Sequence, residues 1–280
     1  IIHQLVELNI GETRSRSYHR IKQALEEKAE TWLTFAQYSA FCQEIDEDMK
    51  DPSQLKSLTE YLDRTGSIVC FRFRQAIQSE GLNQYVFIKS QWLTETIYKI
   101  LDYKILKEKE SRFDNEHVYN IIKAQGDKNQ ISTEEWIDLM RAFELVFPIE
   151  EDGKTSYIVP QYLDEKCPDE IALEMILGAK EETMCNSFAL KYPDFLPRSN
   201  FLRFIAKYGP QSTRYGEGKR RYLVWKEGMV FTDEKTRKTV FAECNYDDGI
   251  ISFQIEDNNP QLAKEIFDTL YKIDDYSGMQ

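Results

Sequence analysis

Apolar residues recur with a helical period through the first third of this chain. Their spacing predicts three helices, which begin near Ser15, at Thr34 and shortly before Leu55. Apolar runs at 67–73 and 85–88 then predict two strands that pair with each other. Helices followed by a β-hairpin are the element order of a winged helix, so the pattern indicates a winged-helix-like unit.

In the stretch 85–101 a strand is expected to lead into a helix with almost no loop between them. Four consecutive apolar residues predict a buried strand, and Ser90 is a favourable N-cap. Leu93 and Ile97 then recur at helical spacing. Trp92 falls in the first turn of this helix, and we expect it to enter the core.

The same order of elements recurs further along the chain. One helix is predicted at 114–124 and is ended by Gly126, and a capping box at Ser132 opens another. Two short strands are predicted at 145–149 and 156–159. The likeness between the two stretches lies in the order of their elements and not in their residues.

Beyond residue 168 the pattern changes to a period of two, which is typical of strands. The run 250–255 alternates apolar and polar residues, and Asp248-Gly249 before it is a strong hairpin signal. Asn259-Pro260 supplies an N-cap and a first-turn proline for a closing helix. An antiparallel sheet covered by helices on one face is the economical fold for this part.

The whole pattern therefore predicts an α+β protein with two parts. The first, 1–165, is helical and holds two winged-helix-like units in tandem. The second, 172–280, is an antiparallel β-sheet with helices on one face.

Composition restricts the class of protein. The chain has 280 residues, of which 41% are hydrophobic and 30% charged, and no apolar run approaches the roughly 18 residues of a membrane helix. The net charge of −12 argues against a general nucleic-acid binder, whose affinity comes mainly from neutralised phosphates. Five scattered cysteines without CxxC spacing, and no signal-peptide core, predict a reduced, cytoplasmic setting. The chain begins at Ile1 without a methionine, so we expect it to be part of a longer protein.

Candidate chemistry is sparse. Three histidines are too few for a histidine-rich metal centre, and no catalytic triad can be built from them with economy. We therefore expect no metal and no catalytic residue. The segment 127–138 resembles a calcium loop, but Ser132 replaces the required glycine and Asp138 the final glutamate. A capped helix start explains that segment better. The tryptophans Trp32, Trp92 and Trp136 lie in apolar stripes, where core packing is the default.

Several motifs occur in the order found in one protein family, and together they cover nearly the whole chain. They are Leu62-Asp63-Arg64-Thr65-Gly66-Ser67-Ile68-Val69, Gln91-Trp92-Leu93, Tyr157-Ile158-Val159-Pro160, Leu196-Pro197 with the helix at Phe201, and Trp225-Lys226-Glu227-Gly228-Met229-Val230. In this order the chain resembles the COR domain, the module that follows the Roc GTPase domain in Roco proteins.

The resemblance implies a COR-A subdomain at about 1–165 and a COR-B subdomain at about 172–280. It also implies a Roc GTPase domain upstream of this chain, which would bind GTP or GDP, and we expect no cofactor in the chain itself. The stretch Gly216–Arg220 is the nearest thing to a phosphate loop, but it lacks a glycine at the required spacing and has Arg220 where Ser or Thr should follow the lysine. A solvated basic loop is the favoured interpretation of this stretch.

The resemblance further implies contacts with partners. The hairpin around Tyr157, Ile158 and Pro160 is expected to face the GTPase domain and to be partly exposed without it. In bacterial Roco proteins, which this chain resembles, COR-B is the dimerising part. Apolar residues near a sheet edge or hairpin tip are the candidates for a homodimer interface, namely Trp225, Gly228, Met229 and Phe231.

Two functions from different classes remain open. The first is a non-enzymatic interaction module, which dimerises and transmits nucleotide state to and from its GTPase. The alternative is a tandem winged-helix nucleic-acid-binding protein, which the element order in 1–165 suggests. An exposed basic face on a recognition helix would favour the alternative.

Overall fold

The computed structural model describes residues 16–74, 81–124, 131–151, 153–180, 182–219 and 221–277. Gly126, the first residues of the calcium-loop-like segment, and Arg220 lie outside these ranges. By its contacts the chain divides into two compact units, Ile1–Lys99 and Ile100–Gln280. The predicted division at 165–172 concerns the family's subdomains and stays a prediction.

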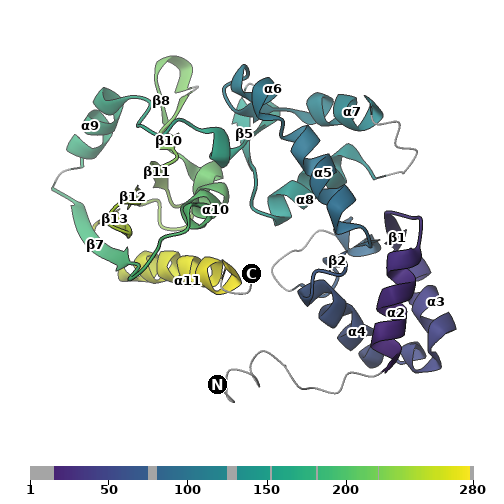
Figure 1. Ribbon diagram of the computed structural model, residues 1–280. Helices are drawn as coiled ribbons and strands as arrows, with labels where there is room; N and C mark the ends of the chain where they lie inside the picture. The colour runs from purple at the N-terminus through teal and green to yellow at the C-terminus, as the bar shows by residue number, and fades with distance from the viewer. Residues whose placement is uncertain are drawn as a thin grey trace. The chain divides into compact units, whose positions relative to one another are not determined.

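The first unit places its helices around a small three-stranded antiparallel sheet of order β1-β3-β2. Strand β1 was not predicted, and it pairs with the free side of β3 (Figure 1). The elements are α2 (Arg16–Glu27), β1 (Trp32–Thr34), α3 (Phe35–Ile45), the 3-10 helix η1 (Glu47–Lys50), α4 (Pro52–Arg64), β2 (Val69–Cys70), the 3-10 helix η2 (Leu82–Gln84) and β3 (Tyr85–Phe87).

Local sequence signals explain where these elements begin and end. Thr34 and Gln37 form a reciprocal capping box that starts α3, as the pattern predicted. Asp51 caps α4 ahead of Pro52 at the first helical position. Gly66 follows α4 with φ +69°, a conformation that glycine adopts without strain, and so ends the helix.

Helix α5 (Ser90–Ile100) follows β3 almost directly. The carbonyl of Lys89 accepts the hydrogen bond from the Leu93 N–H, so Lys89 occupies the cap position and Ser90 is the first helical residue. Leu93 is 2% exposed, whereas Trp92 is only partly buried. The expectation that Trp92 enters the core is therefore wrong, because the helix turns Leu93 and not its neighbour inward.

The second unit begins with elements that repeat the order of the first. Its helices surround an antiparallel sheet of order β4-β6-β5, in which the last strand is again central. A capping box between Ser132 and Glu135 starts α8, as predicted. The elements are α6 (Tyr103–Lys107), β4 (Arg112–Phe113), α7 (Asn115–Ala124), α8 (Thr133–Ala142), β5 (Phe147–Glu151), β6 (Lys154–Ile158) and the 3-10 helix η3 (Pro160–Tyr162).

A five-stranded antiparallel sheet of order β10-β11-β12-β13-β7 forms the rest of this unit. The predicted hairpin at Asp248-Gly249 joins β12 to β13, with Gly249 at φ +63°. The elements are α9 (Glu170–Gly178), β7 (Met184–Lys191), α10 (Arg198–Tyr208), the 3-10 helix η4 (Gly209–Gln211), β8 (Arg214–Tyr215), the 3-10 helix η5 (Glu217–Lys219), β9 (Arg221–Tyr222), β10 (Val224–Trp225), β11 (Gly228–Thr232), β12 (Thr239–Asn245), β13 (Ile250–Glu256) and α11 (Pro260–Ser277).

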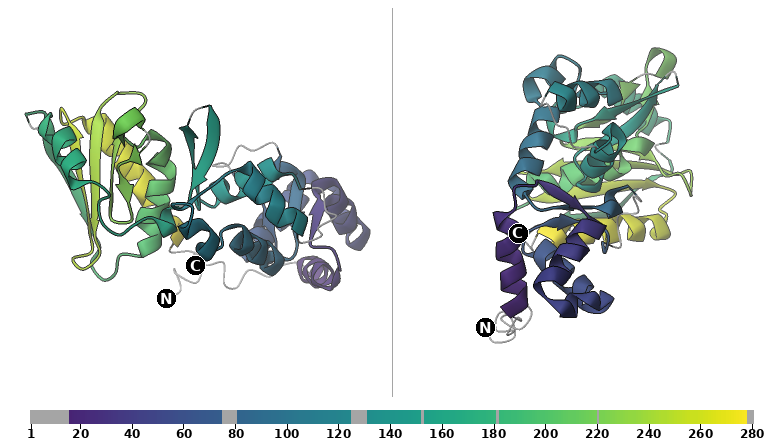
Figure 2. Two further views of the ribbon diagram at one scale, coloured as in Figure 1. Left: turned by 90° about the horizontal axis from the view of Figure 1, so that it is seen from above. Right: turned by 90° about the vertical axis from the view of Figure 1, so that its right-hand side faces the viewer.

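Helices α10 and α11 cover one face of this sheet, which confirms the predicted α+β arrangement (Figure 2). The side chain of Asn259 caps α11 by accepting hydrogen bonds from the Gln261 and Leu262 N–H groups. On the opposite face, α9 packs Ala172, Leu173 and Ile176 against a small buried cluster. Helix α9 was not predicted, and it covers the second face only near Val230 of β11 and Phe241 of β12.

Candidate interaction surfaces

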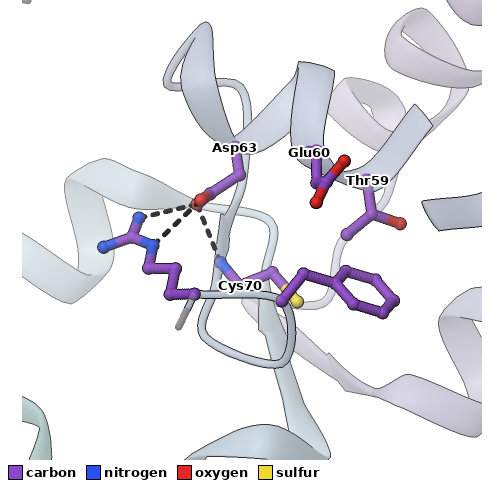
Figure 3. Close-up of a pocket in the computed structure, with 6 residues that line it drawn as sticks. Thr59, Glu60, Asp63 and Cys70 are labelled. Atoms are coloured by element: carbon purple, nitrogen blue, oxygen red, sulfur yellow. Dashed lines mark hydrogen bonds and ion pairs between the residues drawn. The ribbon is translucent and has the colours of Figure 1, made fainter. Parts of the chain in front are cut away.

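The structure offers little for catalysis or metal binding. Within the residues that it describes, no group of three His, Cys, Asp or Glu side chains could hold a metal ion. A small open pocket of about 80 Å³ lies in the first unit between α4 and the segment after β2 (Figure 3). It is lined by Thr59, Glu60, Asp63, Cys70, Phe73 and Arg74.

The polar groups of this pocket already serve the fold. The Asp63 carboxylate accepts two hydrogen bonds from Arg74, at 2.7 and 2.9 Å, and a third from the Cys70 N–H at 3.0 Å (Figure 3). Burial raises the pKa of the Cys70 thiol to about 11, so the thiolate needed for a nucleophile is scarce at neutral pH. The hydrogen bonds of Asp63 therefore join α4 to β2 and to the segment that follows it.

The residues predicted to face the GTPase domain lie inside the second unit. Tyr157 is 9% exposed and stacks on Phe113 with ring centroids 5.5 Å apart. Ile158 is 2% exposed, and Pro160 is buried at the start of η3. The expectation that this hairpin stays partly exposed without a partner is wrong, because β4 and the sheet behind it cover these side chains. Their contact with a GTPase domain stays a prediction.

The four dimer-interface candidates are also buried within the chain. Trp225 is 5% exposed, and its indole lies over Gly228 so closely that a Cβ there would clash with the ring. Met229 and Phe231 are fully buried beneath α10 and α11. The expected exposure at this hairpin is therefore wrong, because its two faces are covered by different parts of the same chain.

The basic loop between β8 and β9 is held by a tyrosine. The guanidinium of Arg214 lies 5.2 Å from the centre of the Tyr222 ring, and that of Arg112 lies 5.8 Å from it. Arg112 also pairs with Glu151 at 2.8 Å. Arg214 thus packs on Tyr222 in a cation–π contact, while Gly216–Gly218 of the loop are exposed, as the solvated-loop interpretation expects.

The strongest geometric feature is the junction between the helical elements and the large sheet of the second unit. Phe147 and Ile149 of β5 and Ile158 of β6 belong to the same buried cluster as α10, α11 and the sheet. Gly209 lies directly on Phe147, where a Cβ would come within 2.5 Å of the ring. The β4-β6-β5 sheet and the five-stranded sheet therefore share one continuous core.

Polar contacts reinforce this junction. The Arg203 side chain on α10 donates to Glu144 at 2.5 Å and to the Ile273 carbonyl of α11 at 3.3 Å. The Lys226 N–H donates to the Asp164 carbonyl at 2.8 Å. A displacement of β5 and β6 would be passed directly to α10, because a close-packed core transmits strain.

Apolar surface that the sequence did not single out is exposed elsewhere in the second unit. On α9, Ile171 and Met175 are 72% and 70% exposed, and on α11, Phe267 and Tyr271 are 43% and 64% exposed. The pairs are each spaced i, i+4, so both members of a pair lie on the same side of their helix. The spacing was visible in the sequence, but the side that faces outward was not.

Known proteins resemble part of this chain. A family model described as C-terminal of Roc, COR-A domain, matches residues 15–163. No curated protein matches the chain. Among solved structures the chain is similar to Methanosarcina barkeri Roco2 RocCORdC bound to GDP, with a TM-score of 0.41 and 24% sequence identity. That match covers 54% of this chain and 44% of the solved one, so the chain spans less than half of that structure.

Proposed function

Since this chain belongs to the COR-A family of domains that lie C-terminal to Roc, we propose that it is the coupling and dimerisation module of a Roco GTPase. In this function the chain passes the nucleotide state of an upstream Roc GTPase domain to a homodimer, and it performs no chemistry of its own. GTP and GDP bind to the Roc domain and not to this chain.

The shared core of the second unit carries this proposal. Phe147, Ile149 and Ile158 stand on the hairpin β5–β6 and are packed into the core of the large sheet. Gly209 caps the C-terminal end of α10 and is in direct contact with Phe147. A Roc domain that shifts this hairpin would therefore shift α10 as well. This shared core supports a role in passing a displacement of the β5–β6 hairpin on to the large sheet.

The test uses the Roc domain from the same reading frame, joined to this chain as in the whole protein. Hydrogen exchange is measured with GDP bound and with a non-hydrolysable GTP analogue bound. We expect the protection of β5, β6 and α10 to change together between the two states. A change confined to the Roc domain, with these elements unaltered, would contradict the coupling role.

The nucleic-acid alternative draws on the repeated order of helices and strands, and charge opposes it. In the order of a winged helix the recognition helices would be α4 and α8. Helix α8 carries Glu134, Glu135 and Asp138 against Arg141. A mobility-shift titration with random duplex DNA tests this alternative, and salt-dependent binding at micromolar protein would support it.

In the part of the chain that the structure describes, no helix is both long and apolar enough to cross a membrane. A cytoplasmic location, where a guanine nucleotide would reach the upstream Roc domain, is part of the proposal.

A further inference from the structure

The turn that ends helix α8 holds a glutamate where such turns usually carry glycine. The Leu145 N–H donates to the Met140 carbonyl at 3.0 Å. The Glu144 N–H donates to the Arg141 carbonyl at 2.9 Å. These two bonds form a Schellman motif, in which the residue after the C-cap adopts a left-handed conformation. Glu144 occupies that position with φ +56°, where a residue with a Cβ is strained and glycine is not.

The carboxylate of Glu144 binds a residue of α10. The Arg203 Nε donates to Glu144 Oε2 at 2.5 Å, and both side chains are partly buried. A charge-assisted hydrogen bond that is shielded from water is stronger than an exposed ion pair. Glycine would fit the backbone at this position without strain, but it would offer Arg203 no carboxylate. The strained glutamate therefore points to a role for its side chain.

The segment 144–147 contacts α10 at two points. Three residues beyond Glu144, the Phe147 ring lies against Gly209 at the C-terminal cap of α10. Arg203 and Gly209 are separated by roughly 9 Å along the helix axis. A single contact would let α10 pivot about it, whereas two contacts restrain both its place and its direction. The turn between α8 and β5 therefore sets the orientation of α10.

Polar side chains of α10 also hold the C-terminal turns of the neighbouring helix α11 (Figure 1). Arg203 Nη1 donates to the Ile273 carbonyl at 3.3 Å. Asn200, which is 1% exposed and lies about one turn earlier on α10, donates to the Asp274 carboxylate at 2.6 Å. Tyr192, which follows β7, donates to the same carboxylate at 2.8 Å. One guanidinium thus joins the turn after α8, helix α10 and the end of α11.

We propose that Glu144 and Arg203 are a positioning pair through which the turn between α8 and β5 sets the position of the C-terminal end of α11. The inference rests on the coupling role of the proposed function and extends it from α10 to α11. A displacement of β5 reaches α10 through the contact of Phe147 with Gly209. It reaches α11 through the ion pair and the Ile273 carbonyl, so the end of α11 follows the nucleotide state of the Roc domain.

Hydrogen exchange of the chain joined to its Roc domain, with GDP or a non-hydrolysable GTP analogue bound, tests the pair with three variants. Glu144→Gly removes the carboxylate and also the backbone strain. Arg203→Met removes the guanidinium donors and keeps an unbranched apolar side chain. Arg237→Gly is the matched control, because Arg237 is exposed in the turn between β11 and β12 and has φ +59°. Glycine relieves a similar strain there and leaves both members of the pair in place.

In the wild type we expect the protection of the C-terminal turns of α11 to change with the nucleotide, together with that of β5 and α10. Glu144→Gly and Arg203→Met should each reduce the change in α11 at least twofold, while Arg237→Gly leaves it as in the wild type. Glu144→Gly should melt within about 3 °C of the wild type, because relief of strain offsets the lost ion pair. A pair that only stabilised the fold would lower the protection of α11 equally in both nucleotide states and leave their difference unchanged.

The outcomes separate this inference from the proposed function. Suppose that β5 and α10 respond to the nucleotide, but the end of α11 does not, or responds undiminished in Glu144→Gly. Either result would overturn the role of the pair and leave the coupling role standing. A wild type in which none of β5, β6 and α10 responds would overturn the coupling role and this inference together. Glu144→Gly decides the matter should Arg203→Met fail to fold.

Discussion

Gly209 and Phe147 are in such close contact that a single added methyl group cannot fit between them. A Cβ on Gly209 would lie 2.5 Å from ring atoms of Phe147, which is fully buried. The atoms that it meets include the first ring carbon, so the ring cannot swing away from its own backbone. The position requires glycine for space and not for conformation, since the φ angle of Gly209 is −52°.

We therefore expect Gly209→Ala to destabilise the second unit by about 1–3 kcal/mol, as overpacking of a dense core does. Chemical unfolding of the full chain measures the change. Gly178→Ala is the control, because no atom lies within 4 Å of the added Cβ and alanine favours a helix. Equal destabilisation by both variants would mean that the two packed regions are not in contact at Phe147.

Two tryptophans should differ in their contribution to stability. Trp136 is 1% exposed, whereas Trp92 is only partly buried. Trp136→Ala is expected to cost about 3–5 kcal/mol, the usual cost of removing a buried aromatic side chain. Trp92→Ala should cost less than half as much. The free energy of unfolding of each variant decides this, and a larger loss for Trp92→Ala would contradict the described burial.

The carboxylate of Glu256 should make stability dependent on pH. Burial alone would raise its pKa, but hydrogen bonds from the Lys180 ammonium at 2.7 Å and the Thr239 N–H at 2.9 Å outweigh burial and lower the pKa below its ordinary value. A carboxyl with a lowered pKa stabilises the fold above its unfolded pKa, and this contribution is lost as the pH falls through the folded pKa.

Glu256→Gln should therefore cost about 1 kcal/mol at pH 7 and nothing in strong acid, where the wild type is protonated as well. Urea unfolding in steps from pH 7 down to pH 2 measures how this cost declines as the wild-type carboxylate is protonated. Glu243→Gln, at an exposed position on β12, is the control and should stay within about 0.5 kcal/mol at each pH. A difference for Glu256→Gln that persists undiminished in acid would show that the ion pair is not its source.

The cysteines should react with alkylating reagents in an order set by burial. Burial raises the pKa of Cys42 and Cys244 to about 12, and both are nearly inaccessible. Cys167 is partly exposed, so it should be modified first in the native chain at pH 8. The experiment uses a Cys185→Ser background, so that only the other four cysteines can react. Mass spectrometry identifies the modified peptide. Modification of Cys42 before Cys167 would contradict the packing of the first unit.

Local signals in the sequence were sufficient to locate most helices and the large sheet. The capping boxes at Thr34 and Ser132 and the N-cap at Asn259 involve residues two or three apart, so they act whatever the rest of the fold does. Strand β1 and helix α9 were missed for opposite reasons. Strand β1 has three residues and depends on its partner β3, whereas α9 has Glu170 and Glu174 among otherwise apolar residues and shows little helical period.

Exposure could not be predicted in the same way. Trp225 and Met229 were expected at a surface because they lie near a sheet edge or hairpin tip, yet the sheet places them on opposite faces and each face is covered. The covering elements, α9 and α10, are distant in sequence from part of what they cover. Burial at this hairpin is a property of the tertiary fold, and a local pattern does not contain it.

Tyr157 offers a last test, because its burial separates two explanations of one effect. Its ring stacks on Phe113, which is its partner in the β4–β6 register. We expect Tyr157→Ala to weaken association with the Roc domain in trans by distorting this sheet.

Phe113→Ala should then weaken association to the same extent, and the melting temperatures of Tyr157→Ala and Phe113→Ala should both fall. Tyr157→Phe keeps the stack and should bind as the wild type does. Calorimetric titration of the Roc domain into each variant measures the affinities. Loss of affinity in Tyr157→Phe at an unchanged melting temperature would instead assign the hydroxyl a direct contact with the partner.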